Sequence, residues 1–153
     1  MRFAMILAHV RASFRATFEA RMSEWALSIS IVIWGLIVLN EPGRFADSRA
    51  YSDFLHLMPQ NAWGLGAFLI GSIRLIVLFF NGLLRRSPHL RAFTAFLSCF
   101  LWLQISLGLF AADGFTGLAM YPVALGMDIF NVLRAAREAG MIDTRVAKNG
   151  PYT

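Results

Sequence analysis

The sequence predicts an all-α integral membrane protein whose four transmembrane helices form a bundle. Of the 153 residues, 58% are hydrophobic and only 15% are charged, whereas soluble domains carry about 25% charged residues. The apolar residues gather in four long runs that are separated by short charged segments. The chain has too few polar residues to cover the surface of a water-soluble globule of this length. We therefore expect lipid to surround its apolar residues.

The four predicted spans form a membrane domain over residues 22–133. Each span is an apolar run that ends at charged residues or at turn-forming glycine and proline. Trp25 and Trp63 stand near the starts of the first two spans, where tryptophan is predicted to anchor a helix at the membrane interface. The predicted spans cover residues 22–40, 63–84, 92–110 and 115–133.

The segments outside the spans are short. Residues 1–22 are predicted to form an amphipathic helix on the cytoplasmic face of the membrane, because aromatic residues recur on one side of it and arginines on the other. The alternative is that this helix folds back onto the cytoplasmic loops of the protein itself. The loop over residues 41–62 is expected to carry a short interfacial helix, and residues 134–153 a short basic cytoplasmic tail.

The distribution of charge predicts the orientation. The chain has a net charge of +5, but its basic residues lie between the apolar runs and not on one soluble domain, so nucleic acid is not an expected partner. With both termini in the cytoplasm, eleven arginine and lysine residues lie inside and two outside. This excess favours that orientation and predicts contact with anionic lipid headgroups.

Two charged residues fall inside predicted spans, Arg74 in the second and Asp128 in the fourth. They lie about 16 Å and about 20 Å from the outer ends of their helices. Because a lone charge at this depth costs about 2.5–3.5 kcal/mol or more, we predict that they pair. The pair would either fix the helix register or line a proton or ion path. The remaining alternative is that they do not meet, and that Gln104 or a neighbouring subunit satisfies Arg74.

Further residues share the helix faces of Arg74 and Asp128. Small residues on these faces are predicted to let the second and fourth spans approach each other, as small residues do in membrane helices. These packing residues are Ala67, Gly71, Gly117 and Ala124. Asn81 and Asn131 are predicted to face each other near the inner side of the membrane. The complete predicted polar stripe comprises Arg74, Asp128, Asn81, Asn131, Gln104 and Tyr121.

The sequence offers no catalytic, cofactor or metal site. Its single cysteine, Cys99, lies in an apolar run, which excludes an internal disulfide or a Cys-x-x-Cys redox pair. The histidines are divided by topology, with His9 and His89 inside and His56 outside, so they cannot converge on one metal ion. We therefore expect a protein that is not an enzyme and that has no cofactor.

Four sequence blocks cover most of the predicted spans. They are SEWALSISIVIWGLIVL, PQNAWGLGAFLIGSIRLIVLFFNG, RRSPHLRAFTAFLSCFLWLQISLGL and TGLAMYPVALGMDIFNVLRAAREA. These blocks resemble small, uncharacterised four-helix membrane proteins of tailed bacteriophages and prophages. The resemblance covers roughly residues 20–140, and it implies a bacterial inner-membrane setting without assigning any catalytic residue.

Two functions are therefore predicted. The first is a non-enzymatic inner-membrane protein that binds or anchors another membrane assembly, because the chain has no soluble domain of its own. The alternative is an oligomeric pore, holin-like or ion-conducting, that uses the Arg74 and Asp128 stripe. A transporter is disfavoured because inverted repeats and titratable clusters are missing from the sequence.

Overall fold

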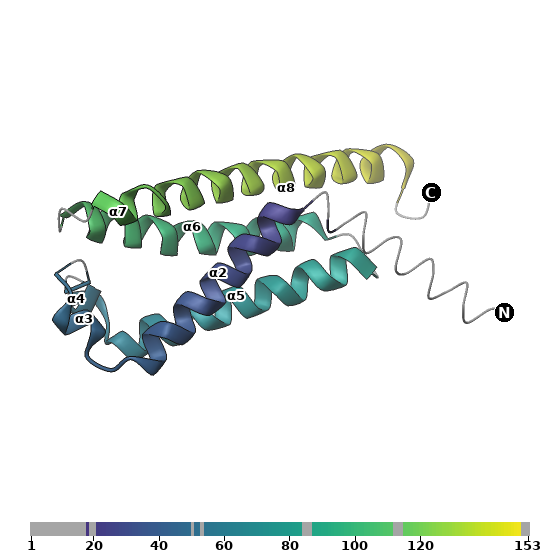
Figure 1. Cartoon of the computed structure of the whole chain (residues 1–153). Coiled ribbons are helices and arrows are strands. Elements are labelled where there is room, and N and C mark those ends of the chain that lie inside the picture. The colour runs from purple at the N-terminus through teal and green to yellow at the C-terminus, as the bar shows by residue number, and fades with distance from the viewer. Residues whose placement is uncertain are drawn as a thin grey trace.

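A computed structural model describes most of the chain, and within the described residues it is helical and contains no β-strand. The described residues form four long helices and three single-turn helices (Figure 1). The described residues are 18, 21–49, 51–52, 54–83, 87–111 and 115–150.

The four long helices are α2 (Met22–Asn40), α5 (Gln60–Leu83), α6 (Pro88–Ala111) and α8 (Tyr121–Asn149). The shortest has 19 residues, or about 28 Å at 1.5 Å per residue, close to the roughly 30 Å of a hydrocarbon core. All four are long and apolar enough to cross a membrane, which confirms this part of the prediction. The bounds of α2 agree with the first predicted span.

The fourth predicted span is divided into two helices. α7 (Phe115–Leu118) is a single turn, and α8 begins at Tyr121 with Pro122 in its first turn. Proline has no backbone N–H, so it is tolerated in the first turn of a helix but not in its interior. The helix is therefore interrupted after Leu118. α8 then continues to Asn149, so the end of the predicted span and most of the predicted tail form one helix.

The long helices pack as two pairs, α2 with α5 and α6 with α8, and α5 also contacts α6 (Figure 1). Glycines allow the close approach of α2 and α5. A Cβ atom added to Gly35 would lie 2.6 Å from the backbone nitrogen of Phe68, and one added to Gly71 would lie 2.9 Å from that of Val32. A residue with a side chain therefore cannot replace either glycine without moving a backbone.

The structure corrects the predicted packing of the second span against the fourth. Gly71 faces α2 instead. Gly117 faces α6, where an added Cβ atom would lie 2.6 Å from Leu109. Ala67 is buried and Ala124 half-buried in the hydrophobic core that includes residues of α2 and α6. A stripe of small residues shows which face of a helix approaches a neighbour, but it does not identify the neighbour.

The segment between α2 and α5 contains two single-turn helices, α3 (Arg44–Asp47) and α4 (Phe54–Leu57). The sequence predicts one short helix here. Gln60, the first residue of α5, holds this segment against α2. Its amide nitrogen donates to the carbonyl of Val38 at 2.7 Å, and its amide oxygen accepts from the backbone N–H of Phe45 at 3.0 Å.

Aromatic side chains cover this end of the helices. Trp63 is 1% exposed, its ring lies 4.9 Å from that of Phe54, and its indole N–H donates to the Phe54 carbonyl at 3.0 Å. Phe45 and Tyr51 stack at 5.2 Å in the same cluster. The structure therefore corrects the prediction that Trp63 is an interface anchor. The loop folds back over it, and the indole becomes a core residue.

The other predicted anchor, Trp25, lies half-buried in the first turns of α2. Its ring centroid is 5.8 Å from that of Phe18. The predicted amphipathic helix over residues 1–22 lies outside the described residues, except for residues 18, 21 and 22.

Candidate functional site, two buried ionic clusters

Arg74 of α5 and Asp128 of α8 form a bidentate ion pair. Arg74 Nη1 lies 2.8 Å from Asp128 Oδ2, and Nη2 lies 2.5 Å from Oδ1. The side chains are 1% and 0% exposed. The two groups that the sequence predicted to pair are therefore in contact, in the fork-to-fork geometry that gives arginine–carboxylate pairs their strength and direction. Because α5 and α8 do not belong to the same packed pair, this bridge joins the two pairs of helices.

α6 supplies two further partners to Asp128. Ser98 Oγ lies 2.6 Å from Arg74 Nη1, from which it accepts, and 2.6 Å from Asp128 Oδ2, to which it can donate. The indole N–H of Trp102 donates to Oδ2 at 3.0 Å. Ser98 and Trp102 are four residues apart and so share one face of α6. Neither residue was predicted as a partner, although their four-residue spacing at the depth of the charges could have indicated them.

The two asparagines of the predicted stripe do not face each other. Asn131 Nδ2 donates to Asp128 Oδ1 at 3.2 Å, and Ser23 of α2 donates to Asn131 Oδ1 at 3.0 Å. Asn81 instead donates to the Val77 carbonyl at 2.8 Å and accepts from the backbone N–H of Ser87. Asn131 therefore belongs to the Arg74–Asp128 cluster, whereas Asn81 closes the end of α5 near the start of α6.

The last two predicted stripe residues lie apart from the ion pair. Gln104 is half-buried beside Phe54, where it lines a cavity at the other end of α6. It is therefore not the partner of Arg74. The ring of Tyr121 lies 6.0 Å from that of Trp102. Tyr121 thus contacts the Arg74–Asp128 cluster through the indole and not through a hydrogen bond to the charges.

A second buried cluster, which was not predicted from the sequence, surrounds Glu24 of α2 and Arg91 of α6. Arg91 Nη2 lies 2.6 Å from Glu24 Oε1, and Nε lies 3.1 Å from Oε2. Both side chains are 2% exposed. The third guanidinium nitrogen of Arg91, Nη1, donates to Glu138 of α8 at 2.6 Å. This Glu24–Arg91 cluster therefore links three of the four long helices.

Two more arginines complete the Glu24–Arg91 cluster. Arg134 lies 3.4 Å from Glu24 and 3.7 Å from Glu138, and Arg21 lies 3.8 Å from Glu138. Burial is the largest cause that lowers the pKa of Arg21, and the nearby positive charge of Arg91 lowers this pKa further. With three guanidiniums against two carboxylates, the cluster carries an excess of one positive charge.

Together the two clusters form polar layers between the helix pairs. The Arg74–Asp128 cluster joins α5 to α8, and the Glu24–Arg91 cluster joins α2 to α6 and α8. The hydrogen bond from Ser23 to Asn131 connects the layers. In the part of the chain that the structure describes, no group of three His, Cys, Asp or Glu residues is placed to hold a metal ion. The arrangement as it stands holds helices together through paired charges.

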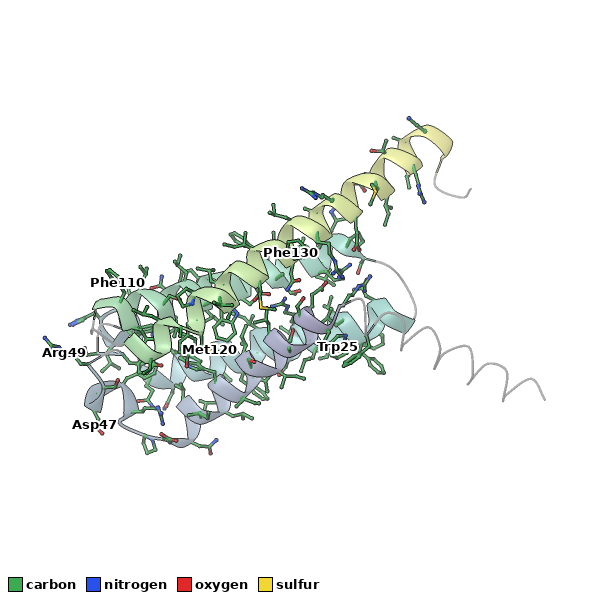
Figure 2. The ribbon with its side chains drawn as sticks, turned by 45° about the horizontal axis from the view of Figure 1, so that its top comes forward. Trp25, Asp47, Arg49, Phe110, Met120 and Phe130 are labelled. Atoms are coloured by element: carbon green, nitrogen blue, oxygen red, sulfur yellow. The ribbon has the colours of Figure 1, made fainter. Side chains whose placement is uncertain are left out.

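A groove of about 540 Å³ opens between α2 and α8 beside the Arg74–Asp128 cluster. Its floor includes Trp102, and Met120 lies at the break between α7 and α8 (Figure 2). We call this the α2–α8 groove. Its lining consists of Leu27, Ser30, Trp102, Thr116, Gly117, Met120, Tyr121, Val123, Ala124 and Met127.

Comparison with known proteins assigns no relative to this chain. No family model matches it, and no curated protein or solved structure is significantly similar to it. Any functional assignment therefore rests on the residues, their contacts and their surroundings.

Proposed function

We propose that this protein is embedded in a membrane, crosses it four times, and acts there by binding or anchoring another membrane assembly. The distribution of polar and apolar side chains supports the membrane setting most strongly. Charged residues such as Arg74, Asp128 and Glu24 are buried, whereas Phe110 and Phe130 lie on the outside of the helices and are 73% and 61% exposed (Figure 2). This distribution of charged and apolar side chains is the reverse of that in a water-soluble protein, and it suits helices surrounded by lipid.

In this proposal both termini face the cytoplasm, and the four spans form a bundle. The excess of arginine and lysine in the segments assigned to the inside supports that orientation. The bacterial inner membrane and an association with a bacteriophage or prophage are part of the same proposal. They are supported by the resemblance of the four sequence blocks to phage membrane proteins.

A non-enzymatic role is supported by the way the charges are used. Asp128 accepts hydrogen bonds from Arg74, Ser98, Trp102 and Asn131, so its oxygens are engaged in holding helices. A buried pair of this kind is well suited to specifying one helix arrangement. The protein would then act through its surface and not through chemistry at these groups.

The α2–α8 groove is the surface that we propose for the partner. It lies between the helix pairs, and its lining includes two methionines, Met120 and Met127, whose unbranched side chains adapt to different contact surfaces. Gly117 and Ala124 add small residues, against which another helix can approach closely. We propose that a transmembrane helix of the partner occupies the groove.

Crosslinking within the membrane tests this function. A photoreactive residue replaces Val123, which lines the groove, or Ile129, which is exposed on α8 outside it. The tagged full-length protein is then purified in mild detergent after irradiation, and bound proteins are identified. We expect one partner to crosslink at position 123 and not at position 129. Equal recovery from both positions, or recovery of no partner, would contradict the proposal.

The alternative function is an oligomeric pore, and the same preparations distinguish it. A pore would need Arg74 and Asp128 to reach water, although both are buried and paired. If crosslinking at position 123 yields only a ladder of copies of this chain, and if modest expression rapidly depolarises bacterial cells, the pore replaces the interaction protein as the better explanation.

A further inference from the structure

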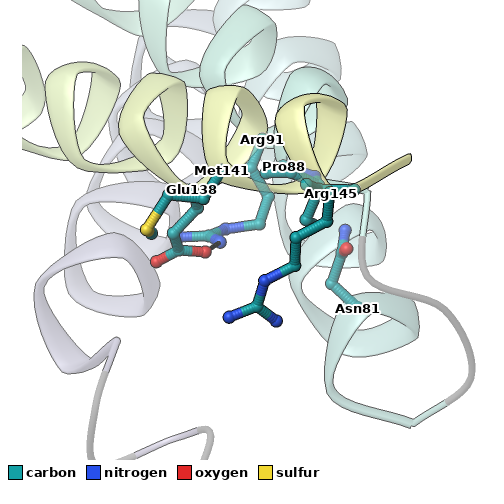
Figure 3. A pocket seen from close by; sticks show the side chains of 7 residues that line it. Asn81, Pro88, Arg91, Glu138, Met141 and Arg145 are labelled. Atoms are coloured by element: carbon teal, nitrogen blue, oxygen red, sulfur yellow. Dashed lines mark hydrogen bonds and ion pairs between the residues drawn. The ribbon is translucent and has the colours of Figure 1, made fainter. Parts of the chain in front are cut away.

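A small pocket lies where α8 passes the end of α5 and the start of α6. Its volume is about 180 Å³. Figure 3 shows the guanidinium of Arg145 extending from α8 into the space between Asn81 and the Arg91–Glu138 pair. Met141 and Ile142 of α8 also line the pocket, so it combines a charged end with an apolar wall.

The charge around this pocket favours an anion. Arg145 is exposed, and within the described ranges no carboxylate forms an ion pair with it. Glu138 is the one carboxylate in the lining, and it is already 2.6 Å from Arg91, 3.7 Å from Arg134 and 3.8 Å from Arg21. Because the Glu24–Arg91 cluster already has one more guanidinium than carboxylates, Arg145 adds a further uncompensated positive charge beside it.

The position of the pocket agrees with the depth of lipid headgroups. Asn81 follows Arg74 by seven residues, and Arg145 follows Asp128 by 17 residues, or about 10 Å and about 25 Å at 1.5 Å per residue. With the Arg74–Asp128 pair at the bilayer centre, the hydrocarbon ends about 15 Å away and the headgroup region ends at about 20–22 Å. The space between Asn81 and Arg145 therefore includes the level of the phosphates.

Exposed apolar side chains occur on the three helices that line this pocket. Phe80 of α5 is 51% exposed, Leu90 of α6 is 46% exposed and Leu133 of α8 is 55% exposed. A ligand with an anionic head at Arg145 and hydrocarbon chains along these helices would match both parts of the surface. A free phosphate would use only the charged part.

We propose that this pocket is a specific site for an anionic phospholipid of the inner leaflet, whose phosphate is bound by Arg145. The inference rests on the proposed membrane placement and orientation, and it names one lipid site on this chain. Arginine is suited to the role because its planar guanidinium can bind a phosphate through two hydrogen bonds. The pocket and the α2–α8 groove have no lining residue in common, so the lipid and the protein partner would occupy different surfaces.

The test uses the purified full-length protein in a neutral detergent. Thermal unfolding is measured during titration with dioctanoyl phosphatidylglycerol, dioctanoyl phosphatidylcholine or inorganic phosphate. We expect stabilisation by phosphatidylglycerol only. Arg145→Ala should weaken this apparent affinity by about tenfold or more, because it removes charged hydrogen bonds. Arg145→Lys should retain part of the affinity, since it keeps the charge but loses the planar fork.

Arg49→Ala is the control, because Arg49 is also an exposed arginine, but it lies in the segment between α2 and α5 and lines neither this pocket nor the neighbouring cavity that Arg145 shares with Arg137. It should bind phosphatidylglycerol like the wild type. The proposal is overturned if phosphatidylcholine stabilises the protein as much as phosphatidylglycerol does, or if both alanine variants weaken phosphatidylglycerol binding equally. It is also overturned if inorganic phosphate stabilises the protein as much as phosphatidylglycerol does and this effect depends on Arg145. Since no other protein is present, failure here would leave the partner crosslinking result unaffected, and failure to find a partner would leave this result unaffected.

Discussion

Asp128 is held by side chains from three of the four long helices. Arg74 reaches it from α5, Ser98 and Trp102 from α6, and Asn131 from its own helix. Removing a carboxylate and a guanidinium from water costs several kcal/mol for each ion, and their attraction offsets that cost only when the remaining hydrogen-bonding groups are also satisfied. The neighbours of this pair meet that requirement, so the pair can persist without contact with water.

Removing either charge alone should therefore destabilise the protein. Arg74→Leu or Asp128→Leu leaves one buried charge without its partner, which typically costs about 3–5 kcal/mol, although access of the freed side chain to water or headgroups would reduce the loss. The double substitution should recover much of the stability, because apolar groups replace both charges. Thermal unfolding of the four proteins in detergent measures the coupling.

An exposed charge provides the control for this cycle. Arg137→Leu should change the unfolding temperature little, since Arg137 is exposed on α8. Losses that simply add in the Arg74 and Asp128 double variant would mean that the two residues are not energetically coupled. Two harmless single substitutions would have the same meaning.

The sequence allowed prediction of this pair but not of its surroundings. Arg74 and Asp128 were identifiable because charges are rare inside apolar runs, and their depth followed from counting residues. Ser98 and Trp102 carry no charge, so only their four-residue spacing at the depth of the charges could have indicated them as partners. Arg91 and Glu24 stand at the ends of runs, where charges ordinarily face headgroups, and the sequence did not indicate that they meet in a buried cluster.

At the scale of the helix, α2 and α5 pack with their backbones close together. Gly35 and Gly71 lie where the two backbones approach, and each would place an added Cβ atom within 3.0 Å of backbone atoms of the opposite helix. Gly126 of α8 has nothing within 4 Å of such an atom. The three glycines lie inside long helices, but only the first two are required by packing.

Gly35→Val should separate α2 from α5. A branched side chain at this position overlaps the backbone of α5 and cannot be accommodated by a change of rotamer, so the loss should reach at least the roughly 1–3 kcal/mol typical of overpacked cores. Gly126→Val is the matched control and should leave the unfolding temperature nearly unchanged. Equal behaviour of the two variants in detergent would show that α2 and α5 do not approach as closely as described.

The extents of α2, α5 and α6 were predictable, but the extent of α8 and the pairing of the helices were not. Apolar runs and turn residues gave the bounds of α2 and placed α5 and α6 within a few residues of their ends. The lipid-facing and protein-facing sides of such helices are both apolar, so periodicity could not show that Gly71 meets α2 and not α8. The burial of Trp63 likewise depends on the fold of the loop above it, which the helical pattern of the spans does not contain.

At the scale of the whole molecule, two closely packed helix pairs are joined by two polar layers and surrounded by exposed apolar side chains. The layers are separated along the helix axes, since Arg91 and Ser98 are seven residues apart on α6, or about 10 Å. Two separated ionic layers fix both the depth and the rotation of one pair against the other. This account requires that lipid, and not water, surrounds the exposed phenylalanines.

Membrane topology tests that requirement most directly. In a Cys99→Ala background, single cysteines replace Arg49, in the segment between α2 and α5, or Lys148, near the end of α8; both positions are exposed. Bacterial spheroplasts are treated with a membrane-impermeant maleimide before and after permeabilisation. The account predicts that Arg49→Cys is labelled in intact spheroplasts and Lys148→Cys only after permeabilisation. Labelling of Lys148→Cys in intact spheroplasts, or protection of Arg49→Cys, would contradict it.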